Sequence, residues 1–426
     1  MTAPLRAPLL DLDVALQRLL EQATPLDGRE EAATFDADGR VLAEDLVSAL
    51  QVPPRDNSSM DGYAVRSADV LQAGAVLPVS QRIAAGHPPE PLRAGTCARI
   101  FTGAQMPPGA DAVVMQEDTE PAGGDPHAVH VHVVPACGQW VRKAGEDVAL
   151  GAVVLERGQR LTPAALGLAA SLGRARLSVA ARPRVALFST GDELVMPGEV
   201  PPESMPAGAI YNSNRFFLRA MLHRMGCEVS DLGIVPDRSE ATLAALKTAA
   251  DHHDLILTSG GVSVGEEDHI KPSVQQLGSL DLWQISMKPG KPFAYGSVRR
   301  DAGAGAVGGS AHFIGLPGNP VSSFVTFVLL VRPFLLALQG VKAPSALALP
   351  RPVMLPAHFA IPKPDKRREF LRVRRNSQGG LDLFPNQSSG VLTSVAWADG
   401  LVDKAAGRTI AHGDLVPFIS FADCLA

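Results

Sequence analysis

The sequence predicts a multidomain protein in which a central α/β domain with a parallel sheet is joined to β-rich domains. Three observations support this fold class. The chain has 426 residues, which exceeds the size of one ordinary core. It contains 40 glycines and 35 prolines but only 5% aromatic residues, a composition that favours turns and short strands over a helical bundle. Between about Arg182 and Gly340, short apolar strands alternate with helical segments.

The first part of the chain combines one helix with short β segments. Apolar residues from Leu10 to Leu20 have helical spacing, and Val41–Val47 resembles a further short element. Short β runs separated by glycine and proline extend from Ala64 to Val141. Thr162–Pro163 then signals a helix start, with threonine as the cap and proline in the first turn. We therefore assign residues 1–50 with 143–181 to an N-terminal linker domain and residues 51–142 to a β-rich insert.

The central segment, residues 182–340, predicts the α/β domain. Expected strands are Val185–Phe188, Val229–Val235, Leu255–Leu257, Leu282–Met287 and Phe313–Leu316, with helices between them. A long apolar helix should follow Asn319–Pro320. Strands that alternate with helices imply right-handed βαβ units and a parallel sheet covered on both faces. Residues 346–426 alternate without a convincing helix and predict a C-terminal β barrel.

Composition and charge exclude several classes of protein. The net charge of −5 disfavours binding to nucleic acid. The four cysteines form no C-x-x-C pair, which favours a reducing compartment over a zinc or disulfide framework. No signal peptide is apparent, and the apolar stretch Phe324–Leu338 is interrupted by Arg332–Pro333, so we expect no membrane span. These features together predict a cytoplasmic protein.

One loop combines features of an anion site with carboxylates. Residues 259–268 read SGGVSVGEED, with the glycine spacing of a phosphate-binding loop but Glu266 where that motif has its lysine. A divalent cation such as Mg²⁺ resolves the conflict, because it bridges carboxylates and phosphate oxygens. Three other unusual loops, at residues 190–193, 236–238 and 316–320, should follow neighbouring strands, where open parallel sheets bind ligands. Lys288 and Lys291, in the turn MKPGKP, offer further positive charge.

A second polar cluster precedes the α/β domain. The turn at residues 56–61 contains Asp56 and Asp61, and Thr102 and Glu117 follow in the β-rich segment. A charged turn at residues 142–147 adds Asp147. Taken alone, these groups are also explained by side chains that bond to their own turn or are solvated.

The motifs in chain order resemble the molybdopterin molybdenumtransferase family, which comprises bacterial MoeA and the E domain of gephyrin. They are DNSSMDGYA, RIFTGAQMPPGADAVVMQE, GEDV, FSTGDEL, TSGGVSVGEED, MKPGKP and GLPGNPVSS, and the resemblance extends from about Leu10 to Phe421. It implies an enzyme that inserts molybdate into adenylylated molybdopterin with Mg²⁺-dependent release of AMP. It also implies an elongated homodimer, with each active site between the α/β domain of one subunit and the β-rich domain of the other.

Carried over by position, the resemblance implies acids at Asp61, Asp147, Glu193, Asp237 and Asp268, with Thr102, Lys288, Pro317 and Pro320 also matched. We expect catalytic roles for Asp61, Thr102, Asp147, Glu193 and Lys288, and a metal held by Glu193, Asp237 and Asp268. We also expect a set of substrate-binding residues, most of which lie in the loops described above. The last two in the list match the family pattern more loosely. The residues are Ser259, Gly260, Gly261, Ser263, Gly265, Lys291, Pro317, Gly318, Asn319, Pro320, Arg372 and Ser389.

The chain departs from the family pattern at three places. Gln284 replaces a basic residue, His269 replaces an aromatic one, and Gln387–Ser388–Ser389 replaces the sequence Q-G-S. These departures weaken the expected phosphate contacts at these places but leave the acids unchanged.

Two alternatives remain at this stage: a molybdopterin adenylyltransferase, whose family resembles the α/β domain alone, and a gephyrin-like scaffold. The DNSSMDGYA cluster and the C-terminal β segment disfavour the first, and the retained acids favour catalysis over the second. The expected partners are an upstream adenylyltransferase and downstream proteins of molybdenum-cofactor maturation.

Overall fold

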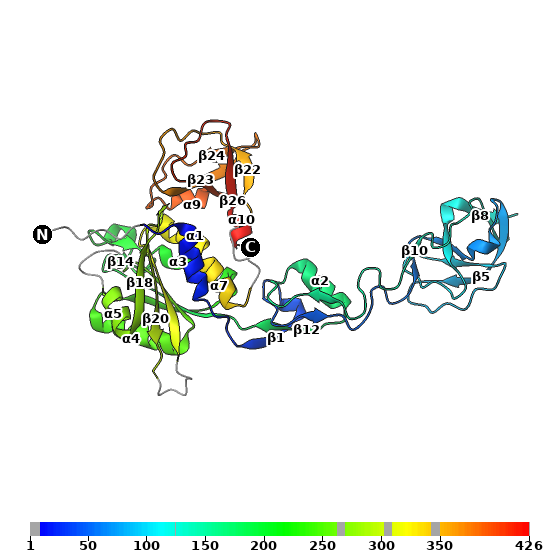
Figure 1. Ribbon diagram of the computed structural model, residues 1–426, viewed down its shortest axis with the longest axis horizontal. Coiled ribbons are helices and arrows are strands. Elements are labelled where there is room, and N and C mark those ends of the chain that lie inside the picture. Colours follow the sequence, from blue (N-terminus) through cyan, green and yellow to red (C-terminus); the bar gives the residue numbers. More distant parts are fainter. Residues whose placement is uncertain (1–8, 124, 262–268, 302–308, 342–349, 426) are drawn as a thin grey trace.

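A computed structural model describes residues 9–123, 125–261, 269–301, 309–341 and 350–425. The molecule is elongated (Figure 1): an α/β unit and a C-terminal β unit lie at one end, and a β-rich unit lies at the other. Between them lies a small linker unit. Its strands pair across large sequence separations. Strand β1 (Arg29–Ala33) pairs with β12 (Arg176–Ala180), and β2 (Leu46–Val47) pairs with β11 (Val153–Leu155).

The helix of the linker unit begins as the sequence predicts. In α2 (Pro163–Ser171), Thr162 is the N-cap and its side chain accepts a hydrogen bond from the backbone N–H of Ala165. Proline occupies the first turn, where the missing N–H costs no hydrogen bond. The apolar side of α2 packs with Leu155, Leu161 and Leu177 in a small core.

The β-rich unit is inserted between β2 and β11. Its six-stranded sheet has the order β7-β4-β6-β5-β9-β8. The strands are β4 (Gly62–Val65), β5 (Ala75–Ile83), β6 (Cys97–Ile100), β7 (Ala112–Met115), β8 (Thr119–Ala122) and β9 (Asp125–Val131). A short pair, β3 (Asn57–Ser58) and β10 (Val141–Arg142), closes the side that faces the linker.

The α/β unit contains a six-stranded sheet of order β16-β13-β17-β21-β20-β18. Its strands are β13 (Arg184–Thr190), β16 (Glu228–Val235), β17 (Leu255–Ser259), β18 (Gly278–Gln284), β20 (Pro292–Arg299) and β21 (Ser310–Leu316). The first four strands of that order are parallel, β20 runs antiparallel to them, and β18 pairs antiparallel with β20. The expectation of a wholly parallel sheet is therefore wrong at one edge, because the ten residues that join β20 to β21 are too few for a parallel crossover.

Helices cover both faces of this sheet, as the alternation of side chains along β13 shows. Val185 and Leu187 belong to the core shared with α3 (Asn214–Arg224) and α7 (Arg332–Leu338). Ala186 and Phe188 belong to the opposite core, with α4 (Ser239–His252) and α5 (Ile270–Leu277). Successive side chains of a strand point to opposite faces, so the fully apolar strand predicted for Val185–Phe188 requires two helical layers.

One helix forms the centre of this unit. It comprises α6 (Pro320–Thr326), a π-helical turn (Phe327–Val331) and α7, and it is continuous from Pro320 to Leu338. The expectation that Arg332–Pro333 interrupts the apolar stretch is therefore wrong. Pro333 would clash with a carbonyl inside a regular α-helix, and the wider π turn before it accommodates the ring. The helix is long and apolar enough to cross a membrane, but its most apolar window is wholly buried in the protein.

The N-terminal helix α1 (Leu12–Glu21) also belongs to this core. Asp11 caps it by accepting a hydrogen bond from the backbone N–H of Asp13. Leu12, Ala15 and Leu19 pack against the long helix. Although its sequence position groups α1 with the linker, the helix covers the α/β unit.

The C-terminal unit contains β22 (Val353–Pro356), β23 (Arg368–Arg375), β24 (Leu381–Leu383), β25 (Gly400–Lys404) and β26 (Leu415–Ser420). Its sheet also includes β19 (Met287–Lys288), which comes from the α/β unit and pairs with β23. Two short helices, α9 (Thr393–Trp397) and α10 (Phe421–Leu425), are present where the sequence pattern suggested none. Each has five residues, too few to produce a helical period.

The buried helix generates a stability prediction. Replacing Leu330, which is 0% exposed, with alanine should lower the free energy of unfolding by about 2–5 kcal/mol, because a cavity remains in a close-packed core. Leu415→Ala is the matched control, since that side chain is 63% exposed and should cost far less. Urea unfolding followed by circular dichroism measures both. Equal losses for the two variants would contradict the assignment of this helix as the main core element.

Candidate active site

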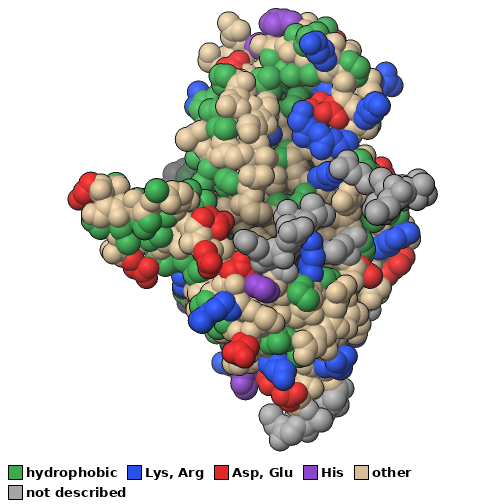
Figure 2. Space-filling model, turned by 90° about the vertical axis from the view of Figure 1, so that its left-hand side faces the viewer, with side chains coloured by type: hydrophobic (Ala, Val, Ile, Leu, Met, Phe, Trp, Pro, Cys, Tyr) green, Lys and Arg blue, Asp and Glu red, His purple; other side chains and the backbone are tan. Residues whose placement is uncertain are grey.

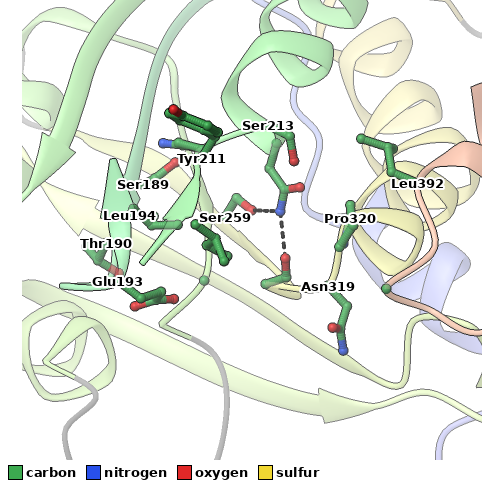
Figure 3. A pocket seen from close by; sticks show the side chains of 16 residues that line it. Ser189, Thr190, Glu193, Leu194, Tyr211, Ser213, Ser259, Asn319, Pro320 and Leu392 are labelled. Carbon is green, nitrogen blue, oxygen red and sulfur yellow. Dashed lines mark hydrogen bonds between the residues drawn. The ribbon is translucent and has the colours of Figure 1, made fainter. Parts of the chain in front are cut away.

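A cavity of about 650 Å³ lies at the carboxyl ends of β13, β17 and β21. Figure 3 shows the side chains that line it. Parallel strands end at one edge of their sheet, and ligands of open α/β proteins bind there. The lining residues are Ser189, Thr190, Glu193, Leu194, Ile210, Tyr211, Asn212, Ser213, Asn214, Ser259, Gly260, Gly318, Asn319, Pro320, Gly390 and Leu392.

Asn214 holds two sides of this cavity together. Its side-chain Nδ2 donates to Ser259 Oγ and to the carbonyl of Gly318, each at 2.7 Å (Figure 3). These groups follow β17 and β21, whereas Asn214 begins α3. Asn214 and Ser259 are both buried, so the amide satisfies polar groups that water cannot reach. The loops after two strands are thus fixed relative to a third element.

Glu193 reaches the cavity from the turn after β13. Gly191 in that turn has φ +142°, and a Cβ at this position would lie 2.5 Å from Glu193 Oε2. A side chain at position 191 would therefore displace the carboxylate. The backbone carbonyl of Glu193 accepts from the N–H of Ile210 at 2.8 Å, which anchors the other end of the turn.

The glycines after β17 allow close approach of the backbone. Gly260 has φ +98°, and a Cβ there would lie 3.1 Å from the carbonyl of Thr190. Its N–H donates to the carbonyl of Leu316, so the ends of β13, β17 and β21 meet at this residue. Gly261 follows but is not a lining residue. The predicted site residues Ser263, Gly265 and Asp268, with Glu266 and Glu267, lie outside the described residues.

The C-terminal unit contributes the remaining wall. The N–H of Val321, in the first turn of α6, donates to the carbonyl of Ser389 at 3.0 Å, and Gly390 and Leu392 line the cavity. Arg372 is 1% exposed and does not line it. Its guanidinium donates instead to the carbonyls of Phe370 and Ser388 and to Ser394 Oγ. Burial lowers the pKa of Arg372 to about 10, and the geometry gives it the role of a positioning residue for the 388–394 segment.

The predicted lysines, Lys288 and Lys291, do not line the cavity. Lys288 Nζ lies 3.0 Å from Glu369 Oε1 and 3.4 Å from Asp365 Oδ2, both in the C-terminal unit. The hydrogen bond from Lys288 to Glu369 raises the pKa of Lys288, so this lysine is protonated at neutral pH. Lys291 accepts through its carbonyl from the N–H of Ile285. Figure 2 shows basic and acidic side chains close together on the C-terminal unit, at the top of that view.

The remaining predicted binding residues fall near the same edge. Asn319 and Pro320 line the cavity, and Pro317 accepts through its carbonyl from Ser323 Oγ at 2.8 Å. Asp237 follows β16, the strand beside β13, but is not a lining residue.

The β-rich unit holds the second predicted cluster. Asp61 Oδ1 accepts from both the backbone N–H and the hydroxyl of Thr102, each at 2.7 Å. These two hydrogen bonds, the backbone one first, lower the pKa of Asp61 below its usual range. The carboxylate is therefore charged at neutral pH. Its partner is a neutral threonine, so the negative charge is available to a ligand.

A salt bridge joins the turns on either side of this unit. Lys143 Nζ lies 3.0 Å from Asp56 Oδ2, and the N–H of Ala144 donates to Asp56 Oδ1. The exposed Asp147 follows in the same segment, where its N–H donates to the carbonyl of Val52. In Figure 1 this unit and the α/β unit, which contains the cavity, occupy opposite ends of the molecule, so one subunit does not bring the two predicted clusters together.

The sequence interpretation gave no site role to Asn214, Tyr211 and Ser189, which line the cavity. Thr190 belongs to a loop that was expected there. A signal existed for two of the missed residues, because the run YNSN at residues 211–214 places polar side chains before an apolar helix. The role of Asn214 depends on contacts with Ser259 and Gly318, which lie 45 and 104 residues away.

The fold and the site define an α/β protein with a cavity at the carboxyl edge of its sheet, closed on one side by a β unit. Three family models match the chain in order: the MoeA N-terminal region (domains I and II) over residues 10–173, a probable molybdopterin binding domain over 186–337, and the MoeA C-terminal region (domain IV) over 354–421. The chain belongs to the molybdopterin molybdenumtransferase family, and it is a transferase.

Curated relatives cover most of the chain. A molybdopterin molybdenumtransferase from Haemophilus influenzae is 42% identical over 78% of this chain and 79% of its own length. One from Synechococcus elongatus is 34% identical over 91% of this chain and 93% of its own. A molybdopterin biosynthesis MoeA structure from Pyrococcus horikoshii, 26% identical, superposes with a TM-score of 0.81 over 97% of this chain and 100% of its own. The fold class expected from the sequence is thereby confirmed.

The Asn214 bridge leads to a prediction about stability. Asn214→Ala should lower the free energy of unfolding by about 1–3 kcal/mol, because it leaves Ser259 Oγ and the Gly318 carbonyl without a buried donor. Asn319→Ala removes the same side chain from an exposed position of the same cavity and should have little effect. Chemical denaturation of the two variants provides the comparison. A neutral effect of Asn214→Ala would show that this bridge is dispensable.

The Asp61–Thr102 contact leads to a prediction about pH. Thr102→Val removes the hydroxyl donor, so the pKa of Asp61 should rise toward its ordinary value and the carboxylate should protonate at a higher pH. Carboxyl ¹³C NMR titration of the aspartate-labelled protein measures this change, with Asp61→Asn to assign the signal. Thr119→Val is the control, since its hydroxyl donates to a backbone carbonyl. An unchanged titration in Thr102→Val would exclude the hydroxyl as a cause of the lowered pKa.

Proposed function

We propose that this protein inserts molybdenum from molybdate into adenylylated molybdopterin and releases AMP in a Mg²⁺-dependent reaction. Support comes from the family, whose curated relatives are named molybdopterin molybdenumtransferases, and from the cavity at the sheet edge. The observation that carries the chemistry is a charge imbalance. Among the described residues, the lining of this cavity includes Glu193 but no lysine or arginine.

A phosphate-containing ligand in such a cavity needs a source of positive charge. The cavity offers oxygen atoms that can bind a metal ion. They belong to the Glu193 carboxylate, to the hydroxyls of Ser189, Thr190 and Ser259, and to the surrounding backbone carbonyls. Mg²⁺ prefers oxygen ligands and is commonly held by one or two carboxylates together with substrate phosphates. These residues therefore fit Mg²⁺, and Glu193 would hold it together with Asp237 and Asp268. When bound, the ion would neutralise charge that develops on the phosphoanhydride oxygens.

The other residues of the cavity bind and orient the substrate. Helix α6 begins at Pro320 without a side-chain cap on its first N–H groups, and a helix N-terminus favours an anion. Gly260 and Gly318 let the ligand approach the backbone closely. Ser259, Asn319 and the glycine-rich loop that continues through Gly261, Ser263 and Gly265 complete the proposed pyrophosphate cradle. Arg372 and Ser389 act by holding the C-terminal wall in place.

Lys288 and Lys291 supply fixed positive charge at the side of this cradle. Glu369 pairs with Lys288 and Lys404, with its Oε2 2.7 Å from Lys404 Nζ. Asp365 pairs with Lys288 and Arg367, so three basic side chains share two carboxylates. This local excess of positive charge favours the molybdate dianion as the substrate that enters beside the pterin.

The metal assignment predicts the phenotype of one carboxamide substitution. Glu193→Gln should reduce Mg²⁺-dependent AMP release and cofactor formation from adenylylated molybdopterin and molybdate, and should raise the Mg²⁺ concentration needed for half-maximal rate. Glu203→Gln makes the same change at an exposed residue that does not line the cavity and should behave as wild type. An unaltered Mg²⁺ dependence in Glu193→Gln would overturn this role. AMP transfer from ATP to molybdopterin by the wild type would instead indicate an adenylyltransferase.

We further propose that the active protein is a homodimer with shared sites. Asp61, Thr102 and Asp147 would come from the β-rich unit of the partner, which accounts for their separation from the cavity within one chain. Asp61 and Thr102 would position the molybdate or the attacking oxygen. In the cytoplasm, the protein would receive the pterin from an upstream adenylyltransferase and pass the product to downstream maturation proteins.

Subunit mixing tests this arrangement. Asp61→Ala and Glu193→Gln homodimers should each have strongly reduced activity, but a mixed dimer should have one site with both residues intact. Random co-assembly should then restore about one quarter of the wild-type rate, because half of the dimers are mixed and each has one working site. Two differently tagged chains, co-expressed and purified over both tags, allow the mixed dimer to be assayed. No restored activity in the purified mixed dimer would place both clusters in one subunit.

A further inference from the structure

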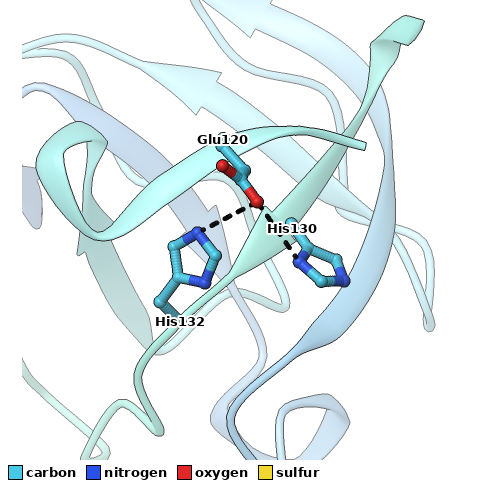
Figure 4. A group of neighbouring side chains, drawn as sticks. All are labelled: Glu120, His130 and His132. Atoms are coloured by element: carbon cyan, nitrogen blue, oxygen red, sulfur yellow. Dashed lines mark ion pairs between the residues drawn. The ribbon is translucent and has the colours of Figure 1, made fainter. Parts of the chain in front are cut away.

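The β-rich unit carries a cluster of two histidines and a glutamate that the proposed reaction does not use. His130 is the penultimate residue of β9, and His132 follows directly after the end of this strand. The two residues are two positions apart in extended backbone, so both side chains project from one face. Glu120, on the neighbouring strand β8, is the direct cross-strand partner of His130. The antiparallel register therefore brings three side chains with metal-binding atoms to one place (Figure 4).

The distances between these atoms are close to those required by one ion. Glu120 Oε1 lies 3.8 Å from His130 Nδ1 and 3.6 Å from His132 Nε2, and all three candidate ligand atoms lie within 4.8 Å of one another. Ligands about 2.0–2.2 Å from a tetrahedral ion lie a little over 3 Å apart, so small rotations of these side chains would close the site. The two imidazole rings meet edge to face, with centroids 5.6 Å apart, and do not stack against each other.

The backbone beneath the cluster is fixed. Val129 and Val131 alternate with the histidines and are 1% and 0% exposed, so they anchor β9 in the core of the unit. The N–H of His132 donates to the carbonyl of Asp118, which extends the pairing past the end of β9. The side chains of Glu120 and His132 remain open to solvent, at 64% and 44% exposure. An ion can therefore reach the three groups without any rearrangement of the strands.

We propose that Glu120, His130 and His132 form a site for a divalent transition-metal ion, with Zn²⁺ as the ion that fits the donor set best. Two imidazoles and one carboxylate are donors that suit zinc, copper and nickel. Three protein ligands leave one tetrahedral position for water or for a donor from another molecule. Mg²⁺ prefers an octahedral set of oxygens and does not fit two imidazoles, so this site is chemically distinct from the Mg²⁺ proposed at Glu193.

Zinc titration of the full-length protein tests this proposal. Calorimetry at neutral pH in a non-chelating buffer should detect a Zn²⁺ site in the wild type that is lost or weakened in His130→Ala and in His132→Ala. The loss of affinity should exceed the roughly 10- to 100-fold that removal of a residue supporting a metal ligand costs. His127→Ala is the matched control: this exposed histidine lies on the same strand but is not one of the three clustered groups. Its affinity should equal that of the wild type.

A spectroscopic measurement distinguishes direct ligation from a change in folding. With one equivalent of Cu²⁺ bound to the wild type, electron paramagnetic resonance should show coupling to two imidazole nitrogens, and His132→Ala should reduce this to one. Far-ultraviolet circular dichroism should be the same for all variants, because the altered side chains are on the surface of the sheet. Equal Zn²⁺ affinity in the wild type and in the His130→Ala/His132→Ala double variant would overturn the proposal, as would equal weakening by His127→Ala. The three groups would then form only a solvent-exposed ion pair.

Discussion

The architecture depends on the need to surround one apolar helix with protein on every side. Between Pro320 and Leu338 almost every side chain is buried, and no single layer of structure could cover them all. The sheet covers one side, α1 and α3 cover others, and the C-terminal unit contributes Leu401, Ile419 and Cys424 to the same core. Arg332 donates from this helix to the carbonyl of Cys424. Burial of this helix thus fixes the C-terminal unit beside the sheet edge and forms the cavity between them.

The start of the same helix forms part of the cavity wall. Pro320 lines the cavity, and the Ser389 carbonyl accepts a hydrogen bond from the N–H of Val321. This part of the wall belongs to the buried core helix, whereas the carboxylate of Glu193 lies on an exposed turn. Such a division suits a site in which the anion is held by fixed backbone groups and the cation by a side chain that can adjust.

The sequence predicted the order of the units and most of the central strands. A strand such as Val185–Phe188 can be recognised because its side chains are apolar on both faces, which indicates burial on both sides. It did not predict β20, which lies between β21 and β18 and runs antiparallel to both. The loops of the candidate site were found from glycines and acids that are local in sequence. Asn214 was not found, because its function is created by partners in distant segments, and Arg372 was expected at the ligand but supports a wall instead. No local pattern distinguishes those two roles.

The connections between the units have a mechanical consequence. The chain passes from the linker to the β-rich unit at Val52 and returns at Val148, where the two segments are bonded to each other, and it passes between the α/β unit and the linker at Gly28 and Ala181 in the same manner. A pair of bonded strands bends more easily out of its plane than within it. The two connections therefore favour bending in one direction at each of these two points. Such bending would move the β-rich unit toward or away from a neighbouring molecule without breaking the pairing of its strands.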